Sequence, residues 1–254
     1  MTALMRALSG EFLKMKRTLA LLVALGLPMV VVLINFFMFL RTKSFEAGSN
    51  GWNYFVSSNM LIWGLLMLTL YITLETALLA SLEHNQQGWK HLAALPIPRA
   101  AVYAAKQIMA MGMVALSMAV IVLGSWASAA LAHALHLNPL APFVGEFPWT
   151  LLLRTAAQSY LLSLLIVAIH SWIATRFANF AFASAVGIAA TVLSFFMSQD
   201  EAMMRLFPWS LPMNPIMQLM GKEVNLAVPM AVSLVGALLV TVIGGWNIVT
   251  RDVL

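Results

Sequence analysis

The stretch "TAAQSYLLSLLIVAIHSWIATRFANFAFASAVGIAATVLSFFMS", residues 155–198, contains a single formally charged residue, Arg176. A helix that crosses the hydrocarbon core of a bilayer, about 30 Å thick, needs roughly 20 apolar residues, because each residue adds about 1.5 Å. As one helix the stretch would be about 66 Å long, twice the thickness of that core. We therefore expect two membrane spans joined by a tight turn near Arg176 and Asn179.

The rest of the chain has the same apolar character. Of its 254 residues, 62% are hydrophobic and 9% are charged, whereas a soluble domain has about 25% charged residues. The composition predicts an all-α polytopic membrane protein that forms a single domain over residues 1–254. Six segments are long and apolar enough to span a membrane: Leu19–Leu40, Asn59–Leu82, Gln107–Leu131, Thr155–Thr175, Phe177–Ser198 and Asn225–Thr250.

The distribution of basic residues predicts the orientation of these spans, because Lys and Arg in short loops concentrate on the cytoplasmic side. With the N-terminus inside, nine of the 14 Lys and Arg residues lie inside and five lie outside. The nine acidic residues divide into four inside and five outside, so nearly all the net positive charge is on the inner side. Both termini and the connection between spans two and three are therefore expected in the cytoplasm.

Residues 1–17 are expected to form an amphipathic helix that lies in the membrane interface. Leu4, Met5, Leu8, Phe12 and Met15 fall within about 100° of arc on a helical wheel, and the basic residues lie off that arc. A frayed basic tail is the alternative interpretation.

The connection between spans two and three continues into "EHNQQGWKHLAALPIPRAAVYAAK", residues 83–106, which is strongly polar. Its run Gln86–Leu95 is compatible with a helix, and Pro96 and Pro98 end that helix because proline lacks the backbone N–H and restricts the residue before it. A short cytosolic helix over about residues 83–98 would suit docking to another protein. The alternative is an interfacial turn anchored by Trp89 among the headgroups, and the residues alone leave both interpretations open.

These residues also form a pattern that goes beyond helix signals. It consists of an acidic residue, Gly-Trp-Lys, Leu-Pro-hydrophobic-x-Arg and a lysine that opens the next span: Glu83, Gly88-Trp89-Lys90, Leu92, Leu95-Pro96-Ile97, Arg99, Tyr103 and Lys106. The pattern resembles the segment between the second and third spans of type-2 ABC exporter permeases. It is most similar to the bacitracin-resistance and lantibiotic-immunity branch. The six spans, the interfacial helix and the inner termini also match that family.

The resemblance implies that the segment is a coupling helix, which contacts a separate cytosolic ABC ATPase present in two copies. The residues that it places at this contact are Glu83, His84, Gln87, Gly88, Trp89, Lys90, Leu92, Leu95, Pro96 and Arg99. It also implies a bacterial cytoplasmic (inner) membrane. Because six spans are few for a closed pathway, we expect a second permease chain, identical or homologous. Whether the pair is a homodimer or a heterodimer stays open.

ATP and Mg²⁺ are expected on the partner ATPase, with no cofactor and no metal in this chain. The only Gly-Lys pair, Gly221-Lys222, lacks the earlier glycine and the following Ser or Thr of a phosphate-binding loop. ATP hydrolysis is therefore assigned to the separate chain, and this chain is expected to be a non-catalytic subunit.

The loop between spans five and six contains apolar pieces broken by prolines. Pro208, Pro212 and Pro215 interrupt a run that includes Trp209. We expect re-entrant segments that dip into the outer leaflet, where protein must cover the irregular backbone. The family places such segments near the substrate exit, so Pro208, Trp209 and Pro212 are candidates for the substrate path. A surface loop with a Trp-Pro anchor is the alternative.

Glu75 is the only formally charged residue inside the six predicted spans. An ionisable group at that depth is costly and usually faces the helix bundle or a cavity. Glu75 is a candidate for the substrate path or for proton sensing, and a hydrogen-bonded packing residue is the alternative. His170 is most simply a helix–helix contact, although a proton relay with Glu75 is conceivable. His133, His136 and Glu146 have ligand types suited to zinc, but scattered polar residues in an outer loop give such sets by chance.

Two functions are compatible with these observations. The leading one is the membrane-spanning subunit of an ATP-driven exporter for an amphipathic or lipophilic substrate, such as a peptide antibiotic, a lipid or a drug, which would connect it to antibiotic resistance or immunity. The alternative is a proton-coupled secondary transporter that uses Glu75. An intramembrane enzyme is disfavoured, because the spans contain no Asp and the chain has neither Gly-x-Ser-Gly nor His-Glu-x-x-His.

Overall fold

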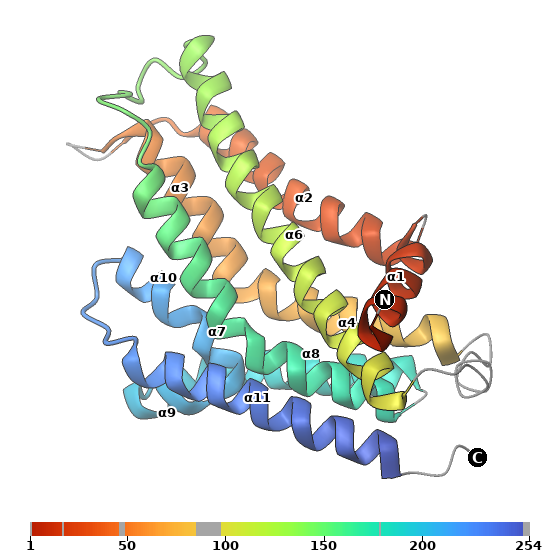
Figure 1. Cartoon of the computed structure of the whole chain (residues 1–254). Helices are drawn as coiled ribbons and strands as arrows, with labels where there is room; N and C mark the ends of the chain where they lie inside the picture. Colours follow the sequence, from red (N-terminus) through yellow and green to blue (C-terminus); the bar gives the residue numbers. More distant parts are fainter. Residues whose placement is uncertain (1, 17, 46–48, 85–97, 178, 251–254) are drawn as a thin grey trace.

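The computed structural model describes residues 2–16, 18–45, 49–84, 98–177 and 179–250, and this part of the chain is helical without any β-strand (Figure 1). The first half contains α1 (Ala3–Met15), α2 (Leu19–Arg41), α3 (Gly51–Ile62), η1 (Trp63–Met67), α4 (Leu68–His84) and α6 (Arg99–Ala134). The second half contains α7 (Trp149–Arg176), α8 (Phe180–Met197), α9 (Glu201–Leu206), η2 (Pro208–Met213), α10 (Asn214–Leu219) and α11 (Ala227–Thr250).

The prediction of six membrane-spanning helices is confirmed. Within the described residues, six helices are long and apolar enough to cross a membrane: Leu19–Arg41, Gly51–Leu82, Arg99–Ala134, Trp149–Arg176, Phe180–Met197 and Ala227–Thr250. The long apolar stretch is divided between two of them. α7 ends at Arg176, and the side chain of Asn179 caps α8 by accepting a hydrogen bond from the Phe182 N–H at 3.2 Å. The chain is therefore a multi-pass membrane protein.

Three helices begin earlier than their apolar runs, and each start has a local cause. The Asn50 side chain accepts a hydrogen bond from the Trp52 N–H at 3.0 Å and so caps α3. Pro98 and Pro148 are the N-cap residues of α6 and α7, where a missing N–H removes no hydrogen bond within the helix. Apolar length alone does not detect these starts, because the first turns of the helices are more polar than their centres.

A π-helical turn, η1, interrupts the helix of the second span, which otherwise runs without a break from α3 into α4. Gly64 lies in this turn, and a Cβ added there would lie 2.6 Å from the Ile216 side chain of α10. Single π turns inside α-helices are rare and are often found at functional sites. Here the turn accommodates the close approach of the segment that precedes α11.

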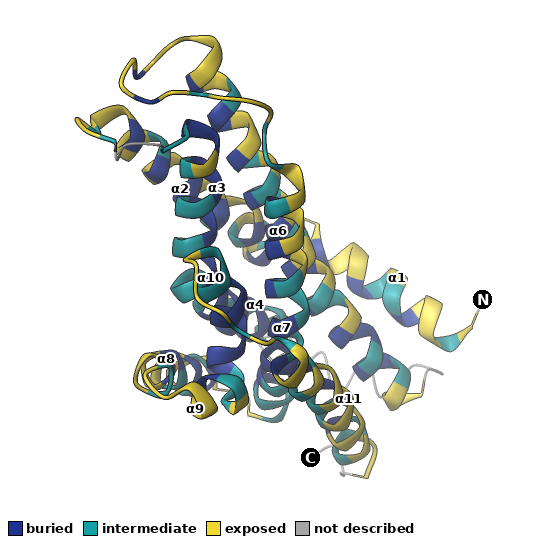
Figure 2. Ribbon diagram, turned by 90° about the vertical axis from the view of Figure 1, so that its left-hand side faces the viewer, coloured by how far each residue is buried: buried dark blue, intermediate teal, exposed yellow. Residues whose placement is uncertain are grey.

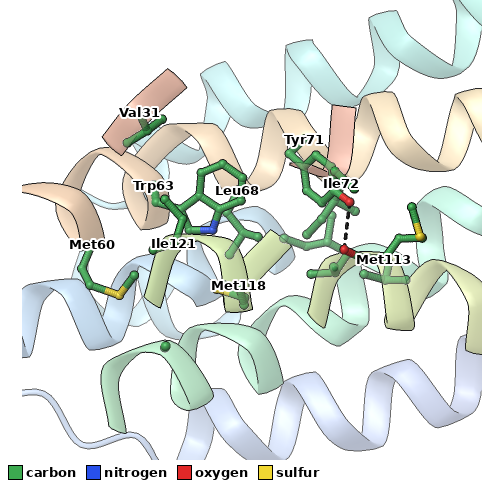
Figure 3. Close-up of a cluster of buried hydrophobic side chains, with 14 of the residues drawn as sticks. Val31, Met60, Trp63, Leu68, Tyr71, Ile72, Met113, Met118 and Ile121 are labelled. Carbon is green, nitrogen blue, oxygen red and sulfur yellow. Dashed lines mark hydrogen bonds between the residues drawn. The ribbon is translucent and has the colours of Figure 1, made fainter. Parts of the chain in front are cut away.

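The core of the bundle is built around α7, which packs against α4, α6, α11 and η2. Its central cluster contains large, fully buried side chains from several helices, and the Tyr71 hydroxyl donates a hydrogen bond to the Met113 carbonyl at 3.0 Å (Figure 3). The outward faces of α8 and α11 are exposed and apolar (Figure 2). Because these faces lack protein cover within the described chain, we assign them to contact with lipid.

The bundle has two ends with different contents (Figure 1). One end, which we call the α1 end, holds α1, the last residues of α4, the first residues of α6, the end of α7, the start of α8 and the last residues of α11. The opposite end, the loop end, holds the end of α2, the start of α3 and the loop 135–148. The segments expected in the cytoplasm thus gather at the α1 end, but which end faces the cytosol stays a prediction.

At the loop end, hydrogen bonds fasten the loop 135–148 to α2 and α3. The Gly51 N–H donates to the Pro142 carbonyl at 2.8 Å, the Asn50 amide to the Val144 carbonyl at 2.7 Å, and the Trp52 indole to the Gly145 carbonyl at 3.1 Å. The Asn138 amide donates to the carbonyls of Phe39 and Thr42 at 2.8 and 3.1 Å. Aromatic rings then pack over these contacts: Phe39, Phe45, Tyr54, Phe55, Phe143 and Phe147.

Candidate functional site

The predicted coupling helix lies between α4 and α6. Glu83 and His84 are the last two residues of α4, and the exposed Arg99 is the first residue of α6, after Pro98. The other residues predicted at the ATPase contact lie outside the described residues: Gln87, Gly88, Trp89, Lys90, Leu92, Leu95 and Pro96. Their role stays a prediction. The structure does define the two helices that would receive a force applied to this segment.

The beginning of α6 is tied to α1 by an ion pair that the sequence analysis did not find. The Lys106 Nζ lies 3.1 Å from both carboxylate oxygens of Glu11, and the Lys14 Nζ lies 2.9 Å from Glu11 Oε1. Glu11 and Lys106 are each only 9% exposed. Because a charge removed from water needs an opposite charge and hydrogen bonds, this α1–α6 ion pair fixes how the two helices meet.

α1 is a helix, as predicted, but the ion pair changes the interpretation of its faces. Its buried face consists of Ala7, Glu11 and Met15. Of the predicted apolar arc, Met5 and Phe12 remain 54% and 59% exposed. The polar side of the helix therefore faces the bundle at Glu11, and Met15 of the predicted arc is buried as well, whereas Met5 and Phe12 stay available for lipid. One feature of the sequence could have indicated this contact: Glu11 is the single acidic residue in a helix whose other charged residues are basic.

A narrow polar crevice adjoins the ion pair. It is lined by Glu11, Lys106, Thr76, Ser171 and Thr175, together with apolar residues of α4 and α6. Its volume is about 20 Å³, enough for about one water molecule. The Ser171 hydroxyl is buried without a hydrogen-bond partner in the described chain. The crevice thus places α1, α4, α6 and α7 around one small polar space.

Glu75, the predicted intramembrane acid, lies in the interior of the bundle. It is fully buried on α4, nine residues before the end of that helix, or about 13 Å along its axis. Neither of its carboxylate oxygens has a hydrogen-bond partner among the described residues. A buried polar group without a partner is costly, and such groups are often retained for a functional reason. The alternative is that Glu75 is a hydrogen-bonded packing residue, but its carboxylate has no hydrogen-bond partner in this part of the chain.

His170 lies where α4, α7, α8 and η2 meet. Its Nε2 is 3.4 Å from the Thr73 hydroxyl, and its ring packs edge-on against Trp209, with the ring centroids 5.4 Å apart. Gly187 of α8 approaches so closely that a Cβ there would collide with both Thr73 and His170. His170 is therefore a helix–helix contact, in line with its simplest interpretation. No hydrogen bond joins it to Glu75 within the described residues.

The proline-rich segment after α9 packs deep inside the bundle. Trp209 and Pro212 are buried and Pro208 is half-buried. Trp209 meets His170 only six residues before the end of α7, or about 9 Å. This depth is compatible with a segment that enters the membrane, but the substrate-path role of Pro208, Trp209 and Pro212 stays a prediction.

The irregular backbone of this segment is satisfied by two buried polar side chains. The Ser210 hydroxyl lies within hydrogen-bond distance of the Met204 and Phe207 carbonyls, at 2.9 and 2.8 Å. The Asn214 amide donates to the Met204 and Leu211 carbonyls at 3.2 and 3.0 Å. Such pairing is required where backbone without regular helical bonds lies in an apolar surrounding.

His133 takes part in aromatic packing at the loop end. Its ring centroid lies 5.0 Å from that of Trp52 and 5.1 Å from that of Phe143. Across residues 2–16, 18–45, 49–84, 98–177 and 179–250, no three His, Cys, Asp or Glu side chains gather in a way that could hold a metal ion. His133, His136 and Glu146 thus do not form such a group.

A comparison with protein families gives one match. The model of the family described as "ABC-2 family transporter protein" matches residues 7–196, about three quarters of the chain. The matched region begins within α1 and ends within α8, so it contains the α1–α6 ion pair, Glu75 and His170. No curated protein and no solved structure matches the chain.

Proposed function

The chain belongs to the ABC-2 transporter family, as the permease subunit of an ABC transporter, and we propose that it works as an exporter. Subunits of this kind are generally non-catalytic and imply a partner ATPase. Nothing in the sequence contradicts that division, because the chain lacks a phosphate-binding loop. In the proposed complex, ATP and Mg²⁺ bind to the partner, and this chain converts nucleotide-driven movement into transport.

The observation that carries the proposal is the placement of the segment between α4 and α6. The family match extends through it, and the two helices that flank it lead directly to Glu75 on α4 and to the α1–α6 ion pair on α6. A partner that pushes on this segment would move both helices. We propose that residues 83–99 form the coupling contact with the ATPase, with Glu83, Trp89 and Arg99 among the contacting residues.

The composition of the spans supports a bulky apolar or amphipathic substrate. Of the 18 Met in the chain, 10 lie within the predicted spans, which contain one formally charged residue. Met side chains adapt to irregular apolar surfaces. We propose a substrate such as a peptide antibiotic, a lipid or a drug, as in the bacitracin-resistance and lantibiotic-immunity branch. Six spans per chain further support a complex of two permease chains in a bacterial cytoplasmic membrane.

The proposal is tested by expressing the chain with a candidate ATPase from the same operon and purifying the complex by a tag on the permease. Co-purification, and ATP-dependent substrate movement in proteoliposomes made from the complex, are expected. In the variant Glu83→Arg/Trp89→Ala, the ATPase should be lost while membrane insertion is retained. Retained association would refute the coupling contact. Transport that needs no ATP and stops with an uncoupler would instead support the proton-coupled alternative through Glu75.

A further inference from the structure

A long apolar groove runs between α1, α2 and α6 at the α1 end. Its volume is about 770 Å³. Its walls include Leu8 and Phe12 of α1, Leu21 of α2, and Met113 and Leu116 of α6. We call this feature the α1 groove; it is separate from the crevice beside the ion pair and from the cluster around His170.

The α1 groove is open space and not a loosely packed core. Gly112 of α6 lines it, and a Cβ added to Gly112 would have no atom within 4 Å. Ile108, one turn earlier, is 43% exposed, and Phe12 is 59% exposed. Contact between water and apolar walls is unfavourable. In a membrane, an apolar ligand is therefore favoured over water in this groove.

The dimensions of the groove fit one leaflet of a bilayer. Along α6 it extends from Ile108 to Leu116, eight residues or about 12 Å. One leaflet contributes about half of a hydrocarbon core that is about 30 Å thick. An acyl chain from a single leaflet could therefore lie along the groove.

A positive charge stands at the edge of the groove. Lys16 lines it at the corner between α1 and α2, is exposed, and forms no ion pair with a described residue. The described part of α1, with its caps, contains three basic residues, Arg6, Lys14 and Lys16, but one acidic residue, Glu11. Glu11 is already bound by Lys106 and Lys14, so it cannot neutralise Lys16.

From the apolar walls and the cationic edge together, we propose that the α1 groove is a binding site for an anionic phospholipid. The acyl chain lies against α6 and α1, and the phosphate is held by Lys16. A Lys residue near an anionic headgroup corresponds to about a fivefold preference. The site does not depend on the transported substrate or on the partner ATPase.

The test uses the purified full chain in detergent micelles that contain phosphatidylglycerol with a photoreactive acyl chain. Phosphatidylcholine with the same chain is the matched neutral probe, and labelled peptides are identified by mass spectrometry. We expect labels on α1 and on Ile108–Leu116, about fivefold stronger with phosphatidylglycerol. Lys16→Gln should remove that preference and retain apolar labelling.

A pair of glycine variants separates the groove from the general lipid surface. Gly112→Trp fills the groove and should abolish its labelling. Gly26→Trp on α2 is the matched control, because a Cβ at Gly26 also meets nothing within 4 Å and Gly26 does not line the groove. Thermal unfolding of both variants, with Gly112→Leu as a smaller filler, shows that the fold is retained.

Two outcomes would overturn the proposal. Equal labelling by both lipids in the unmodified chain would show that Lys16 does not select an anion. Groove labelling that disappears as the chain dimerises, with cross-links between α1 and a second copy, would show that the groove is an interface between permease chains.

Discussion

The two ends of the bundle are held together by different chemistry. At the loop end, neutral hydrogen bonds and tilted or edge-on aromatic contacts join α2, α3 and the loop 135–148, as in the Asn138 contacts to Phe39 and Thr42. In the half that leads to the α1 end, the key contacts are charged or incomplete: the buried Glu11–Lys106 pair, Glu75 without a partner in the described chain, and His170 with one unpaired ring nitrogen. We infer that the loop end stays fixed and that the contacts of the other half can be rearranged, as the proposed action of an ATPase on the segment between α4 and α6 would require.

The largest effect is expected where the charged contact is reversed. Glu11→Lys would leave Lys106 buried beside another cation, and breaking a buried pair typically costs about 3–5 kcal/mol. We expect a strongly lowered unfolding temperature in detergent, loss of transport, and recovery of most of the loss in the double variant Glu11→Lys/Lys106→Glu. If the exchanged pair does not recover stability, the ion pair is not what joins α1 to α6.

A second test compares close glycine contacts in the two regions. Gly187→Ala would force a methyl group into Thr73 and His170, which are fully or almost fully buried, and overpacking of this kind costs about 1–3 kcal/mol. Gly51→Ala would meet the Phe143 ring at 2.7 Å, but this ring is only partly buried, so a small rotation of the ring can relieve the contact at a lower cost. We expect Gly187→Ala to lower the unfolding temperature clearly more than Gly51→Ala, and the reverse order would show that the packing around His170 is looser than the ring packing at the loop end.

The sequence predicted the features that depend on local apolar length and missed those that join distant segments. The six spans follow from hydrophobic runs of sufficient length, and burial of Glu75 is expected for a charge within a span. The Glu11–Lys106 pair joins residues 95 positions apart, and no local pattern indicates that α1 crosses α6 at that point. The hydrogen bond from Trp52 to Gly145 was missed for the same reason, because it depends on how a loop returns after two membrane spans.

At the loop end, a smaller effect on stability without an effect on transport is expected. Asn138→Ala removes the amide that binds two carbonyls at the end of α2, which should cost about 1 kcal/mol. The unfolding temperature should fall slightly, while ATP-driven transport per folded molecule stays unchanged. A proportionate loss of transport would show that the loop end also moves during the cycle. Asn138→Asp has the same size but places a carboxylate oxygen against the two carbonyls, so it should lower the unfolding temperature more than Asn138→Ala if the hydrogen bonds, and not packing alone, stabilise this contact.

The smallest effect on stability is expected at Glu75, although its effect on function should be large. Glu75→Gln keeps the size of the side chain and breaks no hydrogen bond to a described residue. We therefore expect little loss of stability, because one polar group buried without a partner replaces another. If Glu75 lies on the substrate path, transport should fall while ATPase association is retained. The matched control is Glu11→Gln, the same chemical change at a carboxylate that binds two lysines, which should lower the unfolding temperature because Lys106 loses its charged partner. Equal destabilisation by the two variants would mean that the Glu75 carboxylate is paired in the membrane, and the contrast between a static end and a rearrangeable end would then have to be abandoned for α4.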